Sequence, residues 1–415
     1  MKRKIVWGIL YTSCLIIALG LCSCTTEERL HPTSSAAVSE GQTSSIAVTS
    51  SEPRQGGDTD TFRRKVNEYL DFDADVFIPS QTKYGLYRTS LLKFDTNKAK
   101  EAFWGNTEVS VEKPYSDSIY FIDAATGKGV YINDNNLNYT TRSLYTSLVN
   151  LNLGNKDWNN NSAYLNRDLS FMSREKAVTL LNEKLGLFTS LKINAISADI
   201  YSFTNENLRE INDVAISSYQ ERLKTAEAQG LKDRIQSELQ VRSVYKTELE
   251  KDESKQCYYI MAKLTYDMVP IYNSIVNFDA LPSSVDESST LLPPSFVGII
   301  SDDGIESFTL SNNIQVEEPL STYEYSNLIP LEKAIELFEN KYSQIVAKTT
   351  VKSISLSYLY KPVDFSKEHR DDYVLAPVWI FEGRQTPVDA DATDTFPPRE
   401  QFTAFIDAVS GEEIV

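Results

Sequence analysis

The stretch PLEKAIELFENKYS, residues 330–343, closely matches an earlier one, SREKAVTLLNEKLG, at residues 173–186. In both, a Glu-Lys-Ala triplet leads into apolar residues spaced i, i+3 and i+4, which lie on one face of a helix. These residues are Ala177, Leu180 and Leu181 in the earlier copy, and Ala334, Leu337 and Phe338 in the later one. Ser173 is a suitable N-cap, and Pro330 suits a first helical position. The pair predicts one amphipathic helix used twice, the first copy ending at Gly186.

Strand-like segments follow each of the two helices in the same order. The first helix precedes LKINAISADIYSF, CYYIMAKLTYDMVPIY and SFVGIISDDGIESFTL, which begin at residues 191, 257 and 295. The second precedes VKSISLSYLYKPV, YVLAPVWIFEG and FTAFIDAVSGEEIV, which begin at residues 351, 373 and 402. One helix followed by three or four strands packs economically on one face of an antiparallel sheet. We therefore predict an α+β fold with two such modules, at residues 168–325 and 326–415.

The first module carries an insertion at residues 205–244 that the second module lacks. Its apolar spacing and its content of Glu, Lys, Arg and Gln predict helix. Gly230 is the expected break between two helical segments.

A third unit is expected at residues 61–167. FRRKVNEYL, residues 62–70, predicts a short helix, and NKAKEAFWG, residues 97–105, predicts another, capped by Asp95 or Thr96. SIYFIDAATGKGVYIND, residues 118–134, has the pattern of a β-hairpin. NLNYTTRSLYTSL, residues 136–148, predicts a further strand or helix, and the Asn-rich segment at residues 152–168 predicts a loop or boundary before the first module.

The motif FIDA occurs twice, in FIDAATG at residues 121–127 and in FIDAVSG at residues 405–411. Asp123 and Asp407 each precede a turn, where an Asp side chain accepts hydrogen bonds from the next N–H groups. Gly127 and Gly411 permit the positive φ that closes such a hairpin. We interpret both motifs as structural hairpins. The alternative is that the two aspartates are the paired carboxylates of a hydrolase.

The N-terminal 24 residues have the pattern of a secretory signal, with a basic start and a long apolar run. They end in LCSC, which resembles the bacterial lipobox, with Ser23 before the cut and Cys24 as the lipidated residue. A transmembrane anchor is the alternative. Residues 25–60, rich in Ser and Thr, predict a disordered tether. The expected location is the extracellular face of the bacterial cytoplasmic membrane, with the acylated cysteine held in the lipid bilayer.

Charge and cysteine usage narrow the function classes. The formal net charge is −17, and removal of the three basic residues of the signal would take it to −20. Such an acidic protein is not expected to bind nucleic acid. Cys257 is then the one cysteine left besides the anchor, so no disulfide and no cysteine metal cluster are expected. We interpret Cys257 as a small strand residue.

Few residues suggest chemistry. His369 lies in a charged stretch typical of a solvated loop, and no spacing typical of a transition-metal site or a phosphate-binding loop occurs. No cofactor is expected. The acidic stretches at residues 301–304 and 389–396 leave a calcium site open, although neither has EF-hand spacing. Trp158, in the Asn-rich segment, is a candidate platform for a glycan, and Trp379 is expected in the core.

The repeated helix, YVLAPVWIF and the closing FIDAVSGEEI together resemble the PepSY-type module of secreted bacterial proteins and of regulators of the YycH/YycI kind. The resemblance covers residues 331–415, with a degenerate copy at residues 170–325 in which SDDG replaces the hairpin motif. The whole chain also resembles surface lipoproteins of Gram-positive gut bacteria. The resemblance implies a helix packed on a small antiparallel sheet, and a role in restraining a peptidase or modulating a sensor.

The expected function is that of a non-enzymatic lipoprotein that binds a protein or peptide partner at the cell surface. Exposed edges of small sheets would allow a partner strand to add. Two alternatives remain open at this point. One is a solute-binding lipoprotein that serves a transporter, and the other is a cell-wall or glycan hydrolase that uses two carboxylates.

Overall fold

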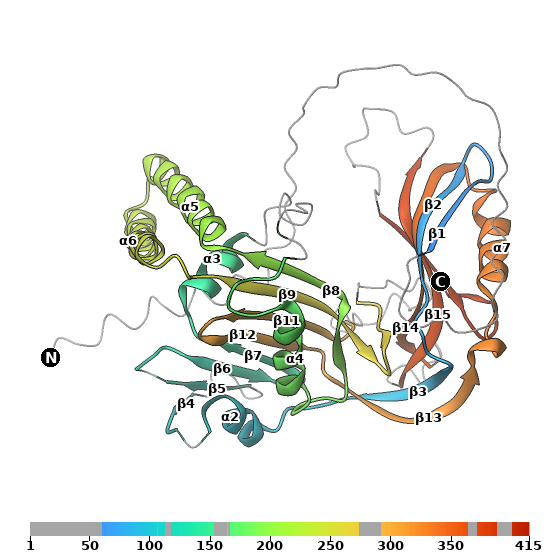
Figure 1. The fold of residues 1–415 in the computed structure, drawn as a ribbon, viewed down its shortest axis with the longest axis horizontal. Coiled ribbons are helices and arrows are strands. Elements are labelled where there is room, and N and C mark those ends of the chain that lie inside the picture. The colour runs from blue at the N-terminus through green and yellow to red at the C-terminus, as the bar shows by residue number, and fades with distance from the viewer. Residues whose placement is uncertain are drawn as a thin grey trace, which may run out of the picture.

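The computed structural model describes residues 60–105, 107–112, 118–123, 125–152, 164, 167–273, 292–363, 372–387 and 401–414. These residues form two sheets with helices packed on them (Figure 1). The paired strands are antiparallel except β2 with β14, so the predicted α+β class is confirmed. The expected signal and tether lie outside the described residues, apart from Asp60. Within the described part of the chain, no helix has the length and apolar character needed to cross a lipid bilayer.

A nine-stranded sheet is built from the middle of the sequence. Its strands lie in the order β10, β9, β11, β12, β7, β6, β5, β4, and β8 also pairs with β9. Their bounds are β4 (Ser110–Glu112), β5 (Ser118–Ile122), β6 (Gly129–Asn133), β7 (Asn136–Thr140), β8 (Lys192–Phe203), β9 (Cys257–Tyr266), β10 (Val269–Pro270), β11 (Ser295–Ser301) and β12 (Gly304–Ser311). Because β7 pairs with β12, strands of the expected third unit and of the first module share one sheet.

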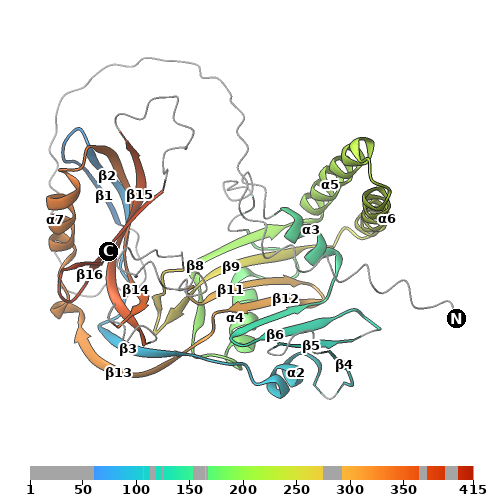
Figure 2. The same cartoon turned by 180° about the vertical axis from the view of Figure 1, so that it is seen from behind.

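Helices cover both faces of the nine-stranded sheet (Figures 1 and 2). They are α2 (Thr96–Trp104), α3 (Leu144–Asn152), α4 (Arg174–Leu185) and the base of the hairpin formed by α5 (Asn205–Thr225) and α6 (Gln229–Lys251), whose outer part stands away from the sheet. Tyr259 and Ile260 are neighbours in β9 and therefore point to opposite faces. Ile260 belongs to the core under α2 and α4, whereas Tyr259 belongs to the core under α3 and the start of α5.

An eight-stranded sheet joins the first and last described segments. Its order is β1, β2, β14, β15, β16, β17, and β3 pairs with both β15 and β13. The strands are β1 (Asp60–Lys65), β2 (Leu70–Phe77), β3 (Lys83–Leu91), β13 (Ile314–Glu324), β14 (Ala347–Pro362), β15 (Tyr373–Pro387), β16 (Phe402–Asp407) and β17 (Glu413–Ile414). Helix α7 (Leu331–Tyr342) packs on one face, where the Phe338 and Phe381 rings stack with centroids 4.4 Å apart.

Both repeated helices form close to the predicted residues. α4 begins after Ser173, whose hydroxyl accepts a hydrogen bond from the Lys176 N–H at 3.3 Å, and it ends before Gly186. α7 begins after Pro330, which is the N-cap rather than the first helical residue. In each module the next strands pair consecutively, as β8–β9–β11–β12 and as β14–β15–β16–β17. The sequence repeat is therefore also a repeat of architecture.

The insertion between β8 and β9 forms two helices as predicted, but with different bounds. α5 begins after Thr204, whose side chain and that of Asn207 cap the helix reciprocally. The helices are separated at residues 226–228 and not at Gly230, which lies in the first turn of α6. One glycine costs a helix only about 1 kcal/mol and does not end it by itself. α6 continues to Lys251, beyond the expected end of the insertion at residue 244.

The prediction of a helix at residues 62–70 was wrong. The segment forms most of β1, a turn and the first residue of β2. The Asn67 side-chain oxygen holds the turn by accepting hydrogen bonds from the N–H groups of Tyr69 and Leu70, both at 2.8 Å. β2 then pairs in parallel with β14, far along the chain. Pairing with a distant strand therefore determined the structure of this segment, and the local sequence pattern gave no sign of that pairing.

Residues 61–167, expected as one unit, contribute to both sheets. β1 to β3 lie in the eight-stranded sheet, and β4 to β7 lie in the nine-stranded sheet. β3 and β13, both strands of the eight-stranded sheet, pair with each other and extend toward the nine-stranded sheet, with Leu91 opposite Ile314 and Lys83 opposite Glu324 (Figure 1). The chain thus leaves the eight-stranded sheet along β3 and returns to it along β13.

Candidate functional site

The first FIDA hairpin joins β5 to β6 and is held by Asp123. The Asp123 Oδ1 atom accepts hydrogen bonds from the N–H groups of Ala125 at 2.9 Å and Thr126 at 3.4 Å. The Gly127 N–H donates to the Asp123 backbone oxygen at 2.7 Å. Gly127 has a φ of 74°, in the left-handed region that favours glycine. The aspartate and the glycine both serve the turn.

The second FIDA hairpin joins β16 to β17 with the same arrangement. The Asp407 Oδ1 atom accepts hydrogen bonds from the N–H groups of Val409 and Ser410, both at 2.9 Å. Gly411 has a φ of 78°, and its N–H donates to the Asp407 backbone oxygen at 2.9 Å. The two hairpins lie in different sheets, so the structure does not bring Asp123 and Asp407 together as a pair of carboxylates.

The Asp123 turn predicts a pH dependence. The hydrogen bond from the Thr126 hydroxyl, followed by that from the Ala125 N–H, holds the pKa of the Asp123 carboxyl below its ordinary value. A carboxyl whose pKa is lowered by folding stabilises the protein above its unfolded pKa, and this stabilisation is lost as the pH falls through the folded pKa. We expect a carboxyl ¹³C titration of Asp123 with a midpoint below the ordinary Asp value of about 3.9.

Asp123→Asn provides the matched stability measurement. In urea unfolding, the wild type should have a larger free energy of unfolding than this variant at pH 7, and the difference should disappear in acid. Two results would contradict the role assigned to the carboxylate. One is a titration midpoint of Asp123 at or above the ordinary Asp value, and the other is a stability difference between the two proteins that persists in acid.

Several residues singled out in the sequence lie outside the described residues. They are Ser23 and Cys24 of the expected lipidation site, Trp158 of the candidate glycan platform, His369, and the acidic stretch at residues 389–396.

Trp379, expected in the core, and Cys257, expected as a small strand residue, are both buried. Trp379, on β15, has no exposed surface, and its indole Nε1–H donates to the Ile329 backbone oxygen at 3.0 Å. Cys257, at the start of β9, is also fully buried. Burial, with a smaller effect of the Glu306 charge, raises the pKa of the Cys257 thiol. A thiol kept protonated in the core is not a nucleophile.

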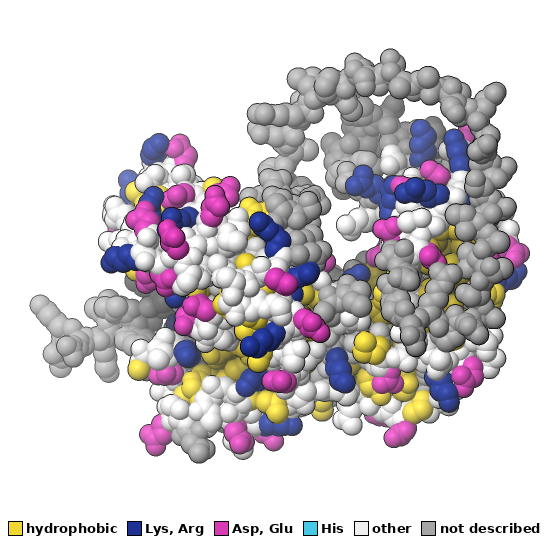
Figure 3. Space-filling model, in the orientation of Figure 1, with side chains coloured by type: hydrophobic (Ala, Val, Ile, Leu, Met, Phe, Trp, Pro, Cys, Tyr) yellow, Lys and Arg dark blue, Asp and Glu magenta, His cyan; other side chains and the backbone are white. Residues whose placement is uncertain are grey.

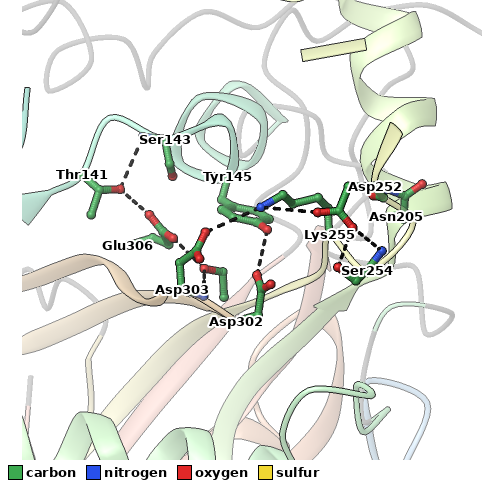
Figure 4. Close-up of polar contacts among 11 residues, drawn as sticks. Thr141, Ser143, Tyr145, Asn205, Asp252, Ser254, Lys255, Asp302, Asp303 and Glu306 are labelled. Atoms are coloured by element: carbon green, nitrogen blue, oxygen red, sulfur yellow. Dashed lines mark hydrogen bonds and ion pairs between the residues drawn. The ribbon is translucent and has the colours of Figure 1, made fainter. Parts of the chain in front are cut away.

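Polar side chains from three segments meet at the end of the nine-stranded sheet near Cys257 (Figure 4). We call them the α3 cluster, because the start of α3 lies over them. The second segment is the loop from α6 to β9, which lies against the first residue of α5. The third segment is the β11–β12 hairpin. The members are Thr141, Ser143, Tyr145, Asn205, Asp252, Ser254, Lys255, Ser301, Asp302, Asp303 and Glu306. Of these, the sequence had drawn attention only to residues 301–304.

Glu306 is the most buried acid of the α3 cluster, with 4% of its surface exposed. Its Oε1 accepts a hydrogen bond from the Ser301 hydroxyl at 2.6 Å, and its Oε2 accepts one from the Thr141 hydroxyl. The Thr141 N–H also donates to the Glu306 backbone oxygen at 2.9 Å. A buried carboxylate requires such donors, because burying it without partners is costly. Glu306 thereby fastens β12 to the segment that enters α3.

Lys255 and Tyr145 complete the outer part of the cluster (Figure 4). Lys255 Nζ lies 3.6 Å from Asp303 Oδ2, 3.9 Å from Asp252 Oδ2 and 5.9 Å from the centre of the Tyr145 ring. The Tyr145 hydroxyl donates to Asp302 Oδ1 at 3.1 Å. Burial, and then the Asp302 charge, raises the pKa of Tyr145, so the phenol remains a hydrogen-bond donor at neutral pH.

The geometry of the α3 cluster indicates a structural role. The Ser301 hydroxyl directs its proton to Glu306 inside the core, and Ser301 has no exposed surface for a substrate to reach. Within the described ranges, no group of three or more His, Cys, Asp or Glu is arranged to hold a metal ion, and this includes the calcium candidate at residues 301–304.

The α5–α6 hairpin stands away from the sheet and is attached at its base (Figure 1). Asn205 Nδ2 donates to the Leu249 backbone oxygen at 3.1 Å, and Arg209 Nη2 donates to the same oxygen at 2.6 Å. The Tyr245 hydroxyl donates to Ser147 Oγ on α3 at 3.1 Å. These bonds join the first turns of α5, the last turns of α6 and the underlying α3.

We call residues 213–241, the part of the hairpin beyond this base, the arm. The hydrogen bonds and ion pairs of its described residues stay within the hairpin, as does the 3.0 Å pair between Asp213 and Lys246. Val214 is 57% exposed, Leu231 and Val241 are each 42% exposed, and Val244, one turn after the arm, is 55% exposed.

The charge of the arm differs from that of the whole chain. It contains four basic and five acidic residues, a net charge of −1, whereas the chain has a net charge of −17. Figure 3 shows charged side chains of both signs interspersed over the hairpin. The arm is therefore a nearly neutral surface with exposed apolar side chains on an acidic protein.

No protein-family model matches the chain, and none of the curated proteins matches it. Among solved structures, the chain is similar to an uncharacterized protein from Eubacterium rectale ATCC 33656. The two share 15% sequence identity, with a TM-score of 0.53, over 85% of this chain and 92% of the other. At this level of identity the likeness concerns the fold alone, and it extends over most of the chain.

Proposed function

We propose that this protein is a lipoprotein anchored by Cys24 at the extracellular face of the cytoplasmic membrane, where it binds a protein partner without catalysis. The arm is the observation that carries the binding role. It is inserted between two paired strands, Phe203 and Cys257 being cross-strand neighbours, and it contributes no strand to either sheet. An insertion that the sheets do not need is a natural place for a binding element.

The composition of the arm supports a protein as the occupant. Exposed Val241 and Val244 lie on the outward side of α6, since the neighbouring Arg242 is buried between the helices and α3. Apolar side chains ringed by charges of both signs are typical of a surface that packs against another protein. The small net charge of the arm lets a partner approach without the repulsion that the rest of this acidic chain exerts on acidic proteins.

The resemblance to PepSY-type modules is consistent with this proposal, because it implies regulation of a peptidase or a sensor through binding. The alternative of a solute-binding protein would require two lobes with parallel α/β sheets. The described strand pairs are instead antiparallel, except β2 with β14. The arm, and not a cleft between lobes, is therefore the element to test.

The test removes almost all of the arm. Replacing residues 214–241 by a short Gly/Ser turn removes Val214 and Val241 but retains Asn212 and Arg242, which are joined by a 2.9 Å hydrogen bond, and so retains the base. Crosslinked capture from membranes of the native cell should recover one defined exported or membrane protein with the wild type and lose it with the shortened protein.

The captured protein is then used to measure affinity. Val241→Asp with Val244→Asp should weaken binding at least about tenfold, because a charge would be buried in the interface. Leu320→Asp, at an exposed leucine on β13, is the matched control and should leave affinity unchanged. Equal capture by the wild type and the shortened protein would refute the role of the arm.

A further inference from the structure

A buried arginine that has no counter-charge among the described residues lies at the base of the arm. Arg242, on α6, has 2% of its surface exposed. Its Nη2 donates to the Ser147 backbone oxygen on α3 at 3.3 Å, and its guanidinium carbon lies 5.5 Å from the centre of the Tyr245 ring. Its Nε and Nη1 are shielded from solvent and have no hydrogen-bond acceptor among the described residues. None of the ion pairs of the described residues includes Arg242.

The described polar side chains next to Arg242, those of Asn212 and Asp213, do not neutralise its charge. Asn212, on α5, donates from Nδ2 to the Arg242 backbone oxygen at 2.9 Å, while its own Oδ1 is buried without a donor. Asp213, the next residue, is held by Lys246 at 3.0 Å and faces solvent. The junction of α3, α5 and α6 therefore contains a full positive charge, a weak bond to one carbonyl and a ring face.

Such an arrangement is strongly unfavourable unless a further group completes it. Guanidinium groups lose a strong hydration shell on burial, and proteins compensate them with anions or with several hydrogen bonds. A water molecule could bridge an Arg242 N–H group and the Asn212 Oδ1, but it would leave the charge uncompensated. An oxyanion would satisfy N–H donors and the charge together, and the planar guanidinium suits carboxylate and phosphate geometry.

We infer that the base of the arm binds a small oxyanion, a carboxylate or a phosphate, at Arg242 between α3, α5 and α6. The site is closed in this structure, so the anion enters when the base of the hairpin opens locally. Bound anion would hold α6 against α3 and so fix the direction of the arm. This inference does not depend on the identity of any partner, since it concerns the interior of the base.

The experiment measures thermal unfolding of the full mature protein at constant ionic strength, with chloride replaced by acetate or by inorganic phosphate. Wild type should show a saturable rise in Tm of about 4 °C with at least one of the two oxyanions, as expected for a ligand that binds only the folded state. Isothermal titration calorimetry with the same anion should give one site per chain. The two anions in parallel distinguish a carboxylate site from a phosphate site.

Two arginine variants separate the site from general salt effects. Arg242→Met should fold, have an anion-free Tm equal to or above that of the wild type, and lose the anion-dependent rise. Arg222→Met is the matched control, because Arg222 also lies 5.5 Å from a tyrosine ring three residues away on its helix but is exposed. It should retain the full rise.

The opposite outcomes would overturn the inference. One such outcome is a wild type that shows neither a saturable anion-dependent rise in Tm nor calorimetric binding. Another is an equal anion-dependent rise in Tm in Arg242→Met. A folded Arg242→Met variant with a much lower anion-free Tm than the wild type would do the same, because Arg242 would then be satisfied by the protein and water alone. If that variant does not fold, the wild-type calorimetry still decides whether an anion binds.

Discussion

Replacing Phe338 by alanine is expected to lower the free energy of unfolding by about 4 kcal/mol. Phe338 lies on α7 at the centre of an aromatic cluster and is almost fully buried. Its ring stacks on Phe381 and Tyr342, with centroids 4.4 and 4.3 Å away, and meets Phe72 and Phe402 edge-on, both at 5.8 Å. Alanine would remove these contacts and leave a cavity between α7 and the sheet, which the paired strands β2, β15 and β16 cannot move to fill. Urea unfolding followed by fluorescence gives the measurement.

The repeat itself supplies the control for this prediction. The first module has leucine at the matching position, Leu181, which is also fully buried. Phe338→Leu should therefore keep most of the packing and cost less than about 1.5 kcal/mol. Glu336→Ala, on the exposed side of the same helix, should change stability by less than about 0.5 kcal/mol. A cost below 1 kcal/mol for Phe338→Ala would show that α7 is not the helix that closes this core.

The helices α2, α4, α5, α6 and α7 were predictable because their signals are local. Apolar spacing placed α4 and α7, the Ser173 hydroxyl caps α4, and the Asp95 side chain caps α2 by accepting hydrogen bonds from the N–H groups of Asn97 and Lys98. The FIDA hairpins were predictable for the same reason, since an aspartate before a turn and a glycine after it act within a few residues. In each case the residues that decide the structure are neighbours in sequence.

The sheets were less predictable because pairing between distant strands has no local signal. FRRKVNEYL has a helix-like pattern, yet its C-terminal end starts a strand that pairs with β14. The helix was wrong because the hydrogen bonds and buried face offered by β14 outweigh a weak helical preference. The same limit hid the division of residues 61–167 between two sheets.

The burial and the partners of the interior polar groups could not be predicted from the sequence for a related reason. Glu306 is satisfied by Thr141, 165 residues away, and Arg242 bonds Ser147, 95 residues away. Whether a charged residue in a strand or helix faces solvent or the core depends on which elements cover it. The sequence therefore showed that the insertion was helical, but not that its base buries an arginine.

Replacing Gly383 by alanine is expected to cost at least about 3 kcal/mol, or to prevent folding. Gly383 lies in β15 between β14 and β16, with Val351 and Phe402 as its cross-strand neighbours. A Cβ atom there would lie 2.0 Å from the Thr350 backbone oxygen and 2.9 Å from the Val351 Cα. The clash is with backbone at a bulge of β14, so no side-chain rotation relieves it, and two central strands would have to separate.

Gly230→Ala is the matched control for Gly383→Ala, because the same methyl group is added in open space. A Cβ atom at Gly230 meets nothing within 4 Å, and the residue lies in the first turn of α6. Alanine there should raise the free energy of unfolding by about 0.5 kcal/mol, because glycine is the poorer helix former. The difference between the two variants, read as urea midpoints at equal slope, isolates the close approach of β14 and β15 from the entropy of glycine. Equal midpoints would mean that the two strands are not packed as closely at this bulge as the structure has them.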